Sequence, residues 1–235
     1  VSAIRLLPDR APPVMRMVFC MLALVPAFVS KQKRKVRERR NATVPAKAPT
    51  ELLMIRHAPA LTEGRMAGRR DVAADCSDAP RFAALQRYIG VADHHWVSPA
   101  LRCRQTVAAL WPDAQPQQDV RLWEQNFGAW EGVAFADLPD LGALSTVELA
   151  AHRPPGGESF ADLCQRVAPA LTMLSQLGGR VAVVAHAGVI RAALGLALGH
   201  AEHGLAFQVA PLSLTRLTAL PGGLWSIGCV NTVVH

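Results

Sequence analysis

The chain has 235 residues, of which 51% are hydrophobic and 18% are charged, and its formal net charge is +7. Such a composition is ordinary for a globular protein with one large domain or two small ones. The sequence pI of about 9.7 would suggest nucleic acid or an anionic membrane as a partner, but the distribution of the charge excludes this for most of the chain.

The net positive charge of the chain comes from the first 49 residues. They carry eleven Lys or Arg and two acidic residues, a net charge of +9, whereas residues 50–235 carry a net charge of −2. All four lysines also lie in residues 1–49. We therefore predict a boundary near Thr50, with a basic N-terminal tail over residues 1–49 and a folded domain over residues 50–235 that does not bind nucleic acid.

Within the tail, residues 17–29 form an apolar stretch, MVFCMLALVPAFV. A helix that spans a bilayer needs about 20 residues, and no signal-peptide cleavage site follows this stretch. We interpret residues 1–49 as a disordered tail, or as an upstream stretch that is not translated in the natural protein. A membrane-surface anchor is the alternative, and membrane contact is expected only in that case.

From Thr50 onward, apolar runs typical of strands alternate with segments of helical periodicity, which predicts an α/β domain. The run VAVVA is wholly apolar and rich in β-branched residues, as strands of a buried parallel sheet are. Strands are expected at residues 52–55 (LLMI), 95–98 (HWVS), 181–185 (VAVVA), 212–217 and 225–230.

Three helices are expected between these strands. The first begins at Pro99, with Ser98 as its N-cap. The second covers residues 158–177, where Ser159 and Asp162 resemble a capping box, and two glycines at 178–179 end it. The third covers residues 189–198.

Two histidines follow expected strands directly. Arg56 and His57 come after LLMI, and His186 comes after VAVVA. In open α/β sheets, ligands bind at the carboxyl ends of the strands, where the helix after Gly188 would also direct free N–H groups at an anion. A single histidine at a strand end is more often structural, but the pair favours an anion site.

The stretch SPALRCRQT at residues 98–106 adds an arginine to this edge. On a helix that begins at Pro99, the residues Ser98, Arg102 and Thr106 share one side, whereas Arg104 points elsewhere. The planar guanidinium of Arg102 suits the oxygens of a phosphate dianion. A solvated surface arginine is the alternative for this position.

Five stretches together resemble the motif set of the histidine phosphatase superfamily, which has the phosphoglycerate-mutase-like fold. They are RHA at 56–58, SPALRCRQT at 98–106, LWEQNFGAWEG at 122–132, PPGGESFADLCQRV at 154–167 and VVAHAGVIRAAL at 183–194. The resemblance implies a three-layer sandwich with a mostly parallel central sheet and helices on both faces. It also implies that residues 50–235 are the catalytic domain.

The resemblance also implies the roles of the site residues. His57 would be the nucleophile that accepts the phosphoryl group, and Glu124 would protonate the leaving oxygen, with Glu131 as the rival acid. Arg56, Arg102 and His186 would bind the phosphate oxygens and neutralise the transition state without a metal or other cofactor.

The sequence departs from the family pattern after the first histidine. Ala58 stands where glycine is usual, and a positive φ there would cost about 1 kcal/mol. The loop at residues 59–71 does not align cleanly, so either Arg65 or Arg69 is expected to contact the substrate, and the choice stays open.

Metal chemistry has weak support in the sequence. The pairs His94–His95 and His200…His203 lack a third ligand of matching spacing, so we interpret them as loop histidines. The five cysteines are scattered without a C-x-x-C pair, which predicts reduced thiols and a cytoplasmic location.

The FGAWEG and PGGES stretches resemble the branch that contains α-ribazole-phosphate phosphatase of cobalamin biosynthesis and broad-specificity sugar phosphatases. We therefore expect a phosphomonoester hydrolase for a small phosphorylated metabolite, such as α-ribazole 5′-phosphate or a sugar phosphate. The alternatives are mutase-type phosphoryl transfer and a catalytically silent relative that binds a phosphorylated ligand or a protein. The oligomeric state stays open, with a homodimer among the options.

Overall fold

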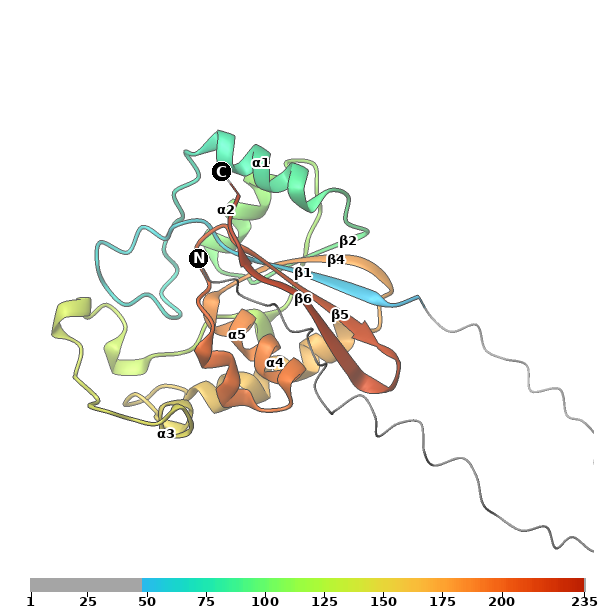
Figure 1. Cartoon of the computed structure of the whole chain (residues 1–235). Helices are drawn as coiled ribbons and strands as arrows, with labels where there is room; N and C mark the ends of the chain where they lie inside the picture. The colour runs from blue at the N-terminus through green and yellow to red at the C-terminus, as the bar shows by residue number, and fades with distance from the viewer. Residues whose placement is uncertain (1–47, 235) are drawn as a thin grey trace, which may run out of the picture. The chain divides into compact units, whose positions relative to one another are not determined.

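The computed structural model describes residues 48–234, so the prediction for the basic tail lies outside the described residues apart from its last two positions. Six strands form one central sheet in the order β3-β2-β4-β1-β5-β6 (Figure 1). Their bounds are β1 (Thr50–Arg56), β2 (His94–Val97), β3 (Gln117–Gln118), β4 (Gly179–Ala185), β5 (Leu214–Leu220) and β6 (Leu224–Thr232). The first four strands are parallel, and β5 and β6 are antiparallel additions at one side.

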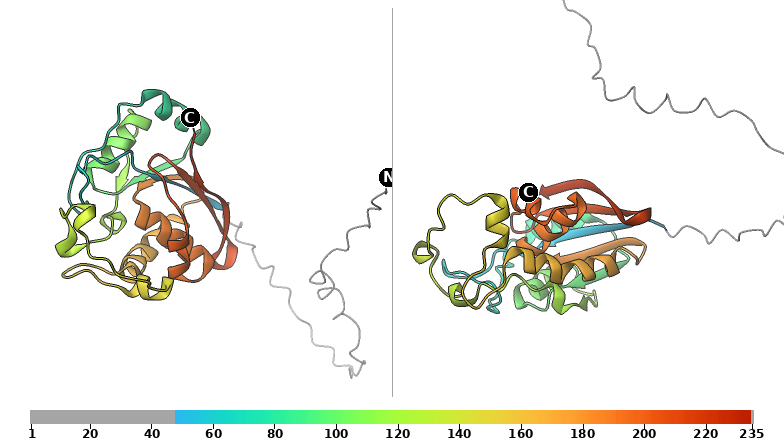
Figure 2. Two further views of the ribbon diagram at one scale, coloured as in Figure 1. Left: turned by 60° about the vertical axis from the view of Figure 1, so that its left-hand side comes forward. Right: turned by 90° about the horizontal axis from the view of Figure 1, so that it is seen from below.

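The helices cover both faces of the sheet, with α1 and α2 on one side and α4 and α5 on the other (Figures 1 and 2). The α-helices are α1 (Ala79–Ile89), α2 (Leu101–Leu110), α3 (Thr146–Ala151), α4 (Phe160–Leu174) and α5 (Ala187–Leu198). Short 3-10 helices are η2 (Val120–Leu122), η3 (Gly128–Trp130), η4 (Phe135–Asp137), η5 (Ala201–Ala206) and η6 (Pro221–Gly223). The expected three-layer α/β fold is confirmed.

The apolar strand β1 explains why the layers form. Leu53 and Ile55 point into the cluster that holds α1 and α2, whereas Leu52 and Met54 point into the cluster that holds α4 and α5. All four side chains are at most 1% exposed. A strand buried on both faces needs a continuous apolar run, which is what LLMI supplies.

Several expected boundaries were wrong. The helix α2 begins at Leu101 with Ala100 as N-cap and no side-chain cap. The hydroxyl of Ser98, the expected cap, lies 2.8 Å from Nε2 of His186 and accepts from the N–H of Ala100 at 3.4 Å. The helix α4 has the expected capping box of Ser159, but it ends at Leu174, before the two glycines. The helices α1 and α3 and the strand β3 were not predicted from the sequence.

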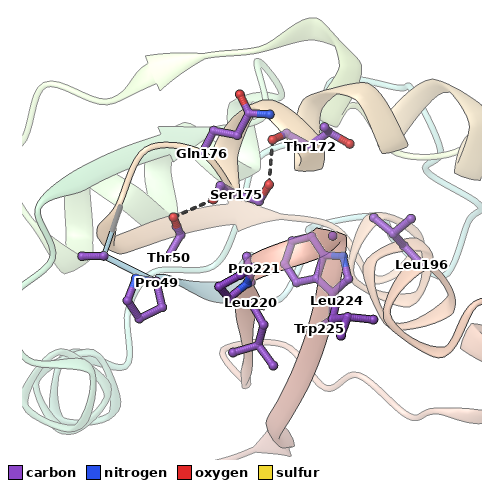
Figure 3. Close-up of a pocket in the computed structure, with 13 residues that line it drawn as sticks. Pro49, Thr50, Thr172, Ser175, Gln176, Leu196, Leu220, Pro221, Leu224 and Trp225 are labelled. Carbon is purple, nitrogen blue, oxygen red and sulfur yellow. Dashed lines mark hydrogen bonds between the residues drawn. The ribbon is translucent and has the colours of Figure 1, made fainter. Parts of the chain in front are cut away.

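A cavity of about 580 Å³ lies at the end of the sheet where β1 begins (Figure 3). Thr50, Ser175 and Trp225 are among its lining residues, and Thr50 Oγ1 donates a hydrogen bond of 2.7 Å to the Ser175 carbonyl. His57 follows the opposite end of β1, about 20 Å away for a strand of this length. The cavity is therefore separate from the predicted phosphate site. Over residues 48–234, no helix has the length and apolar character that a membrane crossing requires.

Candidate active site

The carboxyl ends of β1 and β4 bring the two predicted histidines together. The backbone N–H of His57 donates to the carbonyl of Ala185, 3.0 Å away, so His57 extends the pairing of the two strands by one residue. His186 follows Ala185 directly and is the N-cap of α5. The two imidazole rings lie edge to face with centroids 5.2 Å apart.

The ring of His57 is held in one tautomer, with the lone pair of Nε2 directed at Arg102. Nδ1 lies 2.7 Å from the carbonyl of Ala58, which can only accept, so Nδ1 carries the hydrogen and Nε2 keeps its lone pair. Burial lowers the pKa of His57 to about 3, and the positive charges of Arg102 and Arg56 add to this, against the opposing effect of the Ala58 carbonyl. His57 is therefore neutral at pH 7.

Arg102 lies beside His57 and is 1% exposed. Its Nε is 3.3 Å from Nε2 of His57, Nη1 donates to the carbonyl of Arg70 at 3.0 Å, and Nη2 donates to the carbonyl of Gly68 at 2.7 Å. A guanidinium has five N–H groups, so two remain for an oxyanion after these three contacts. The loop at residues 68–70 thus fixes the guanidinium, a role that was not predicted from the sequence.

Arg56 supplies a second guanidinium, which is partly buried. Its Nη1 donates to the carbonyl of Val209 at 2.6 Å, whereas its Nε is buried and has no partner among the described residues. Burial lowers the pKa of Arg56, although a guanidinium stays charged at any physiological pH. A buried donor without a partner is the kind of group that a bound phosphate oxygen would satisfy.

His186 is fully buried, and its surroundings fix its ring. The hydroxyl of Ser98 lies 2.8 Å from Nε2, the thiol of Cys103 lies 3.5 Å from the same atom, and the indole of Trp123 is stacked at a centroid distance of 6.4 Å. Burial, with the charge of Arg102 next, lowers the pKa of His186 well below its usual range. A neutral His186 therefore neighbours the two arginines.

Glu124 reaches the same sheet edge from the loop between η2 and η3. One carboxylate oxygen accepts from the N–H of Gln125 at 3.0 Å, and the other lies 3.3 Å from the N–H of Gly188 in the first turn of α5. A Cβ on Gly188 would lie 2.3 Å from the carboxylate. The glycine therefore permits the approach of Glu124 to the residues after His186.

Glu131, the rival acid, is engaged elsewhere. Its Oε1 accepts from the backbone N–H groups of Arg69 and Phe127, at 2.9 and 3.0 Å. Arg65 donates to the carbonyl of Gly132 at 3.0 Å, and Arg69 lies 3.5 Å from Glu158. Both arginines thus hold the loop at residues 59–71 to neighbouring segments, with Arg69 the closer in sequence to the carbonyls that bind Arg102.

Two other expectations concern Ala58 and the remaining histidines. Ala58 does not adopt a positive φ, so the backbone strain that a positive φ would cause at an alanine is absent. The interpretation of His94–His95 as loop residues was wrong, because both belong to β2. Within residues 48–234, no group of three or more His, Cys, Asp or Glu side chains is placed to hold a metal ion.

A family model named histidine phosphatase superfamily (branch 1) matches residues 52–232 of the chain. A bifunctional protein of Mycobacterium tuberculosis is 30% identical over 208 residues, which cover 78% of this chain and 54% of that protein. The chain spans about half the length of the curated relatives that it matches.

Two solved structures share the fold. A mycobacterial glucosyl-3-phosphoglycerate phosphatase, in complex with VO3, is 25% identical with a TM-score of 0.67, over 77% of this chain and 98% of that chain. An Escherichia coli protein assigned as an α-ribazole-5′-phosphate phosphatase is 22% identical with a TM-score of 0.66, over 78% of this chain and 96% of that chain.

The central sheet, parallel over β1 to β4, thus carries a cluster of two arginines and two histidines at its carboxyl edge, on a fold shared with these two proteins. The chain belongs to the histidine phosphatase superfamily, branch 1.

Proposed function

We propose that the chain is a metal-independent phosphomonoesterase in which Nε2 of His57 attacks the phosphorus of a small phosphorylated metabolite. The observation that carries this proposal is the state of the His57 ring. Its Nδ1 hydrogen is held by the Ala58 carbonyl, and Nε2 faces the guanidinium of Arg102. A neutral imidazole fixed in this way is a nucleophile that needs no activation.

The reaction has two steps. In the first, Nε2 of His57 forms a bond to phosphorus, the bond from phosphorus to the leaving oxygen breaks, and the protonated carboxyl of Glu124 gives its proton to that oxygen. In the second, water attacks the phosphohistidine while the Glu124 carboxylate takes a proton from it. Phosphate leaves, His57 is neutral again, and Glu124 is again protonated.

The positive charge around His57 supports this course. The equatorial oxygens of a phosphoryl group carry negative charge in the transition state, and buried donors near them are worth more than donors in water. The free N–H groups of Arg102 and the unpartnered Nε of Arg56 are such donors. His186, held by Ser98, is the third group that we assign to the phosphate oxygens.

For the substrate we propose α-ribazole 5′-phosphate or a sugar phosphate. This rests on the FGAWEG and PGGES stretches and on the likeness to the two phosphatases described above. We place the leaving group near Glu124, with Arg69 or Arg65 as the substrate contact at the edge of the site.

The test is phosphate release by the full chain in excess EDTA. The panel contains α-ribazole 5′-phosphate, glucosyl-3-phosphoglycerate, 3-phosphoglycerate and 4-nitrophenyl phosphate. We expect EDTA-resistant release that is abolished in His57→Ala and unchanged in His203→Ala, which alters an exposed histidine outside the cluster. An active His57→Ala protein would refute the phosphohistidine, and a wild-type protein inactive on every ester would point to mutase chemistry or to a silent binding protein.

A further inference from the structure

Arg166 of α4 makes an unusually complete set of contacts next to the candidate site. Its Nε lies 2.7 Å from one carboxylate oxygen of Glu158, and its Nη2 lies 2.9 Å from the other. Its Nη1 donates to the carbonyls of Arg121 at 2.7 Å and Trp123 at 3.1 Å, and Nη2 also donates to the carbonyl of Glu124 at 3.2 Å. These contacts use all five N–H groups of the guanidinium, so none is left for a substrate.

Glu158 completes the attachment from its other side. Its carboxylate accepts from the backbone N–H of Asn126 at 2.9 Å, and its own carbonyl accepts from the side chain of Gln125 at 2.8 Å. Its backbone N–H donates to the carbonyl of Asn126 at 2.8 Å. Arg166 and Glu158 therefore hold the residues on both sides of Glu124.

The segment that they hold has no regular structure of its own. The 3-10 helix η2 ends at Leu122 and η3 begins at Gly128, so the carbonyls at residues 123 and 124 lie between two elements. Partly buried carbonyls need hydrogen-bond donors, and here a charged side chain supplies them. The position of the Glu124 backbone therefore depends on Arg166 rather than on a helix or a strand.

We propose that Arg166 is a positioning residue that, with Glu158, fixes the loop of Glu124 so that its carboxyl meets the leaving oxygen. The proposal rests on the proposed function, because it assigns Arg166 to the proton-transfer step of that reaction. Misplacement of a general acid by about 1 Å is enough to lose much of its contribution, which is typically 10²- to 10⁴-fold.

The experiment compares two esters of similar shape that differ in their need for an acid. Phenyl phosphate has the more basic leaving oxygen, whereas 4-nitrophenyl phosphate leaves readily without a proton. In the full chain, Arg166→Gln is expected to lower kcat for phenyl phosphate by about 10- to 100-fold and to lower kcat for 4-nitrophenyl phosphate much less. Arg166→Lys, which keeps the charge but not the fork, should lie between Arg166→Gln and the wild type.

Arg180 provides a matched control. It lies at the start of β4, whereas His186 follows the end of the same strand. It pairs with Glu51 through Nε at 2.9 Å and donates to the carbonyls of Ile89 and Val91, so it is bonded much as Arg166 is. Arg180→Gln should lower the melting temperature without changing the ratio of kcat values for the two esters.

A second readout is additivity. If Arg166 acts through Glu124, Arg166→Gln should cost little more once Glu124→Gln is present. An unchanged ester ratio in a folded Arg166 variant, or losses that add in full, would overturn the positioning role while leaving the proposed function intact. If Arg166→Gln does not fold, Arg166→Lys and Glu158→Gln carry the same test. A wild-type protein inactive on both esters would overturn the proposed function and this inference with it.

Discussion

At the scale of single residues, the candidate site is built around guanidiniums that backbone carbonyls hold in place. Arg102 is bound by two backbone carbonyls and lies against His57, so its guanidinium would not have to reorganise to bind the phosphate that we propose. Preorganised donors of this kind stabilise a transition state more than mobile ones do. The geometry of the fork should therefore matter as much as its charge.

Arg102→Lys tests this directly. Lysine keeps the positive charge but loses the planar fork, so we expect kcat/KM to fall by at least about 10²-fold, with kcat and KM both affected. Steady-state kinetics with 4-nitrophenyl phosphate, and inhibition by inorganic phosphate, would measure the loss. Arg104→Lys, an exposed position on the same helix, is the control. A change in KM alone would show that Arg102 binds substrate without stabilising the transition state.

At the scale of elements, the loops over the site are joined by close backbone contacts. Gly128 at the start of η3 has φ +53°, and a Cβ there would lie 2.2 Å from the carbonyl of Pro155 and 2.6 Å from the N–H of Gly157. The FGAWEG and PGGES stretches therefore touch through a glycine that no other residue can replace without movement of the backbone.

Gly128→Ala should destabilise the protein through both φ and contact. Gly142 has φ +67° with nothing within 4 Å of its Cβ position, so Gly142→Ala isolates the backbone strain. We expect about 1 kcal/mol for the control and roughly 1–3 kcal/mol more for Gly128→Ala, measured as the free energy of unfolding in urea. Equal losses in the two variants would mean that the loops separate without cost.

The elements also show what the sequence can predict. Wholly apolar runs predicted β1 and β4 correctly because such runs have few alternatives to a doubly buried strand. The helix α1 was missed although Phe82, Leu85 and Ile89 are buried at helical spacing after Asp78, which caps the helix. That signal was present and could have been found.

The site was predictable only in part, for a physical reason. Strand ends predicted that His57 and His186 would meet, because neighbouring parallel strands end at the same edge of a sheet. Ser98 was expected to be an N-cap from its local sequence. Its pairing with His186 joins residues 88 positions apart, which a local pattern cannot show. Arg166 binds carbonyls, which every residue has, so no pattern of side chains marks its partners.

At the scale of the whole molecule, the buried histidines couple the site to the stability of the fold. Burial lowers the pKa values of His57 and His186, whereas in the unfolded chain both would titrate near 6.5. Between pH 6.5 and about 3 the unfolded chain therefore binds more protons than the folded chain at His57. The contribution of these groups to stability is complete above pH 6.5 and is lost as the pH falls.

We therefore expect the free energy of unfolding to fall between pH 6.5 and 5.5, a window that lies above the titration of the carboxylates, which is near 4 in the unfolded chain. Each buried histidine should contribute a slope of up to about 1.4 kcal/mol per pH unit, so His57→Gln should reduce the slope by about that amount. Urea denaturation at several pH values, in buffers without phosphate because bound phosphate would stabilise the folded state, measures it. His203→Gln, at an exposed position, controls for the loss of an ordinary histidine. Equal slopes in the wild type and His57→Gln would mean that His57 accepts a proton in the folded protein as readily as in water, and that the fold does not keep the proposed nucleophile neutral.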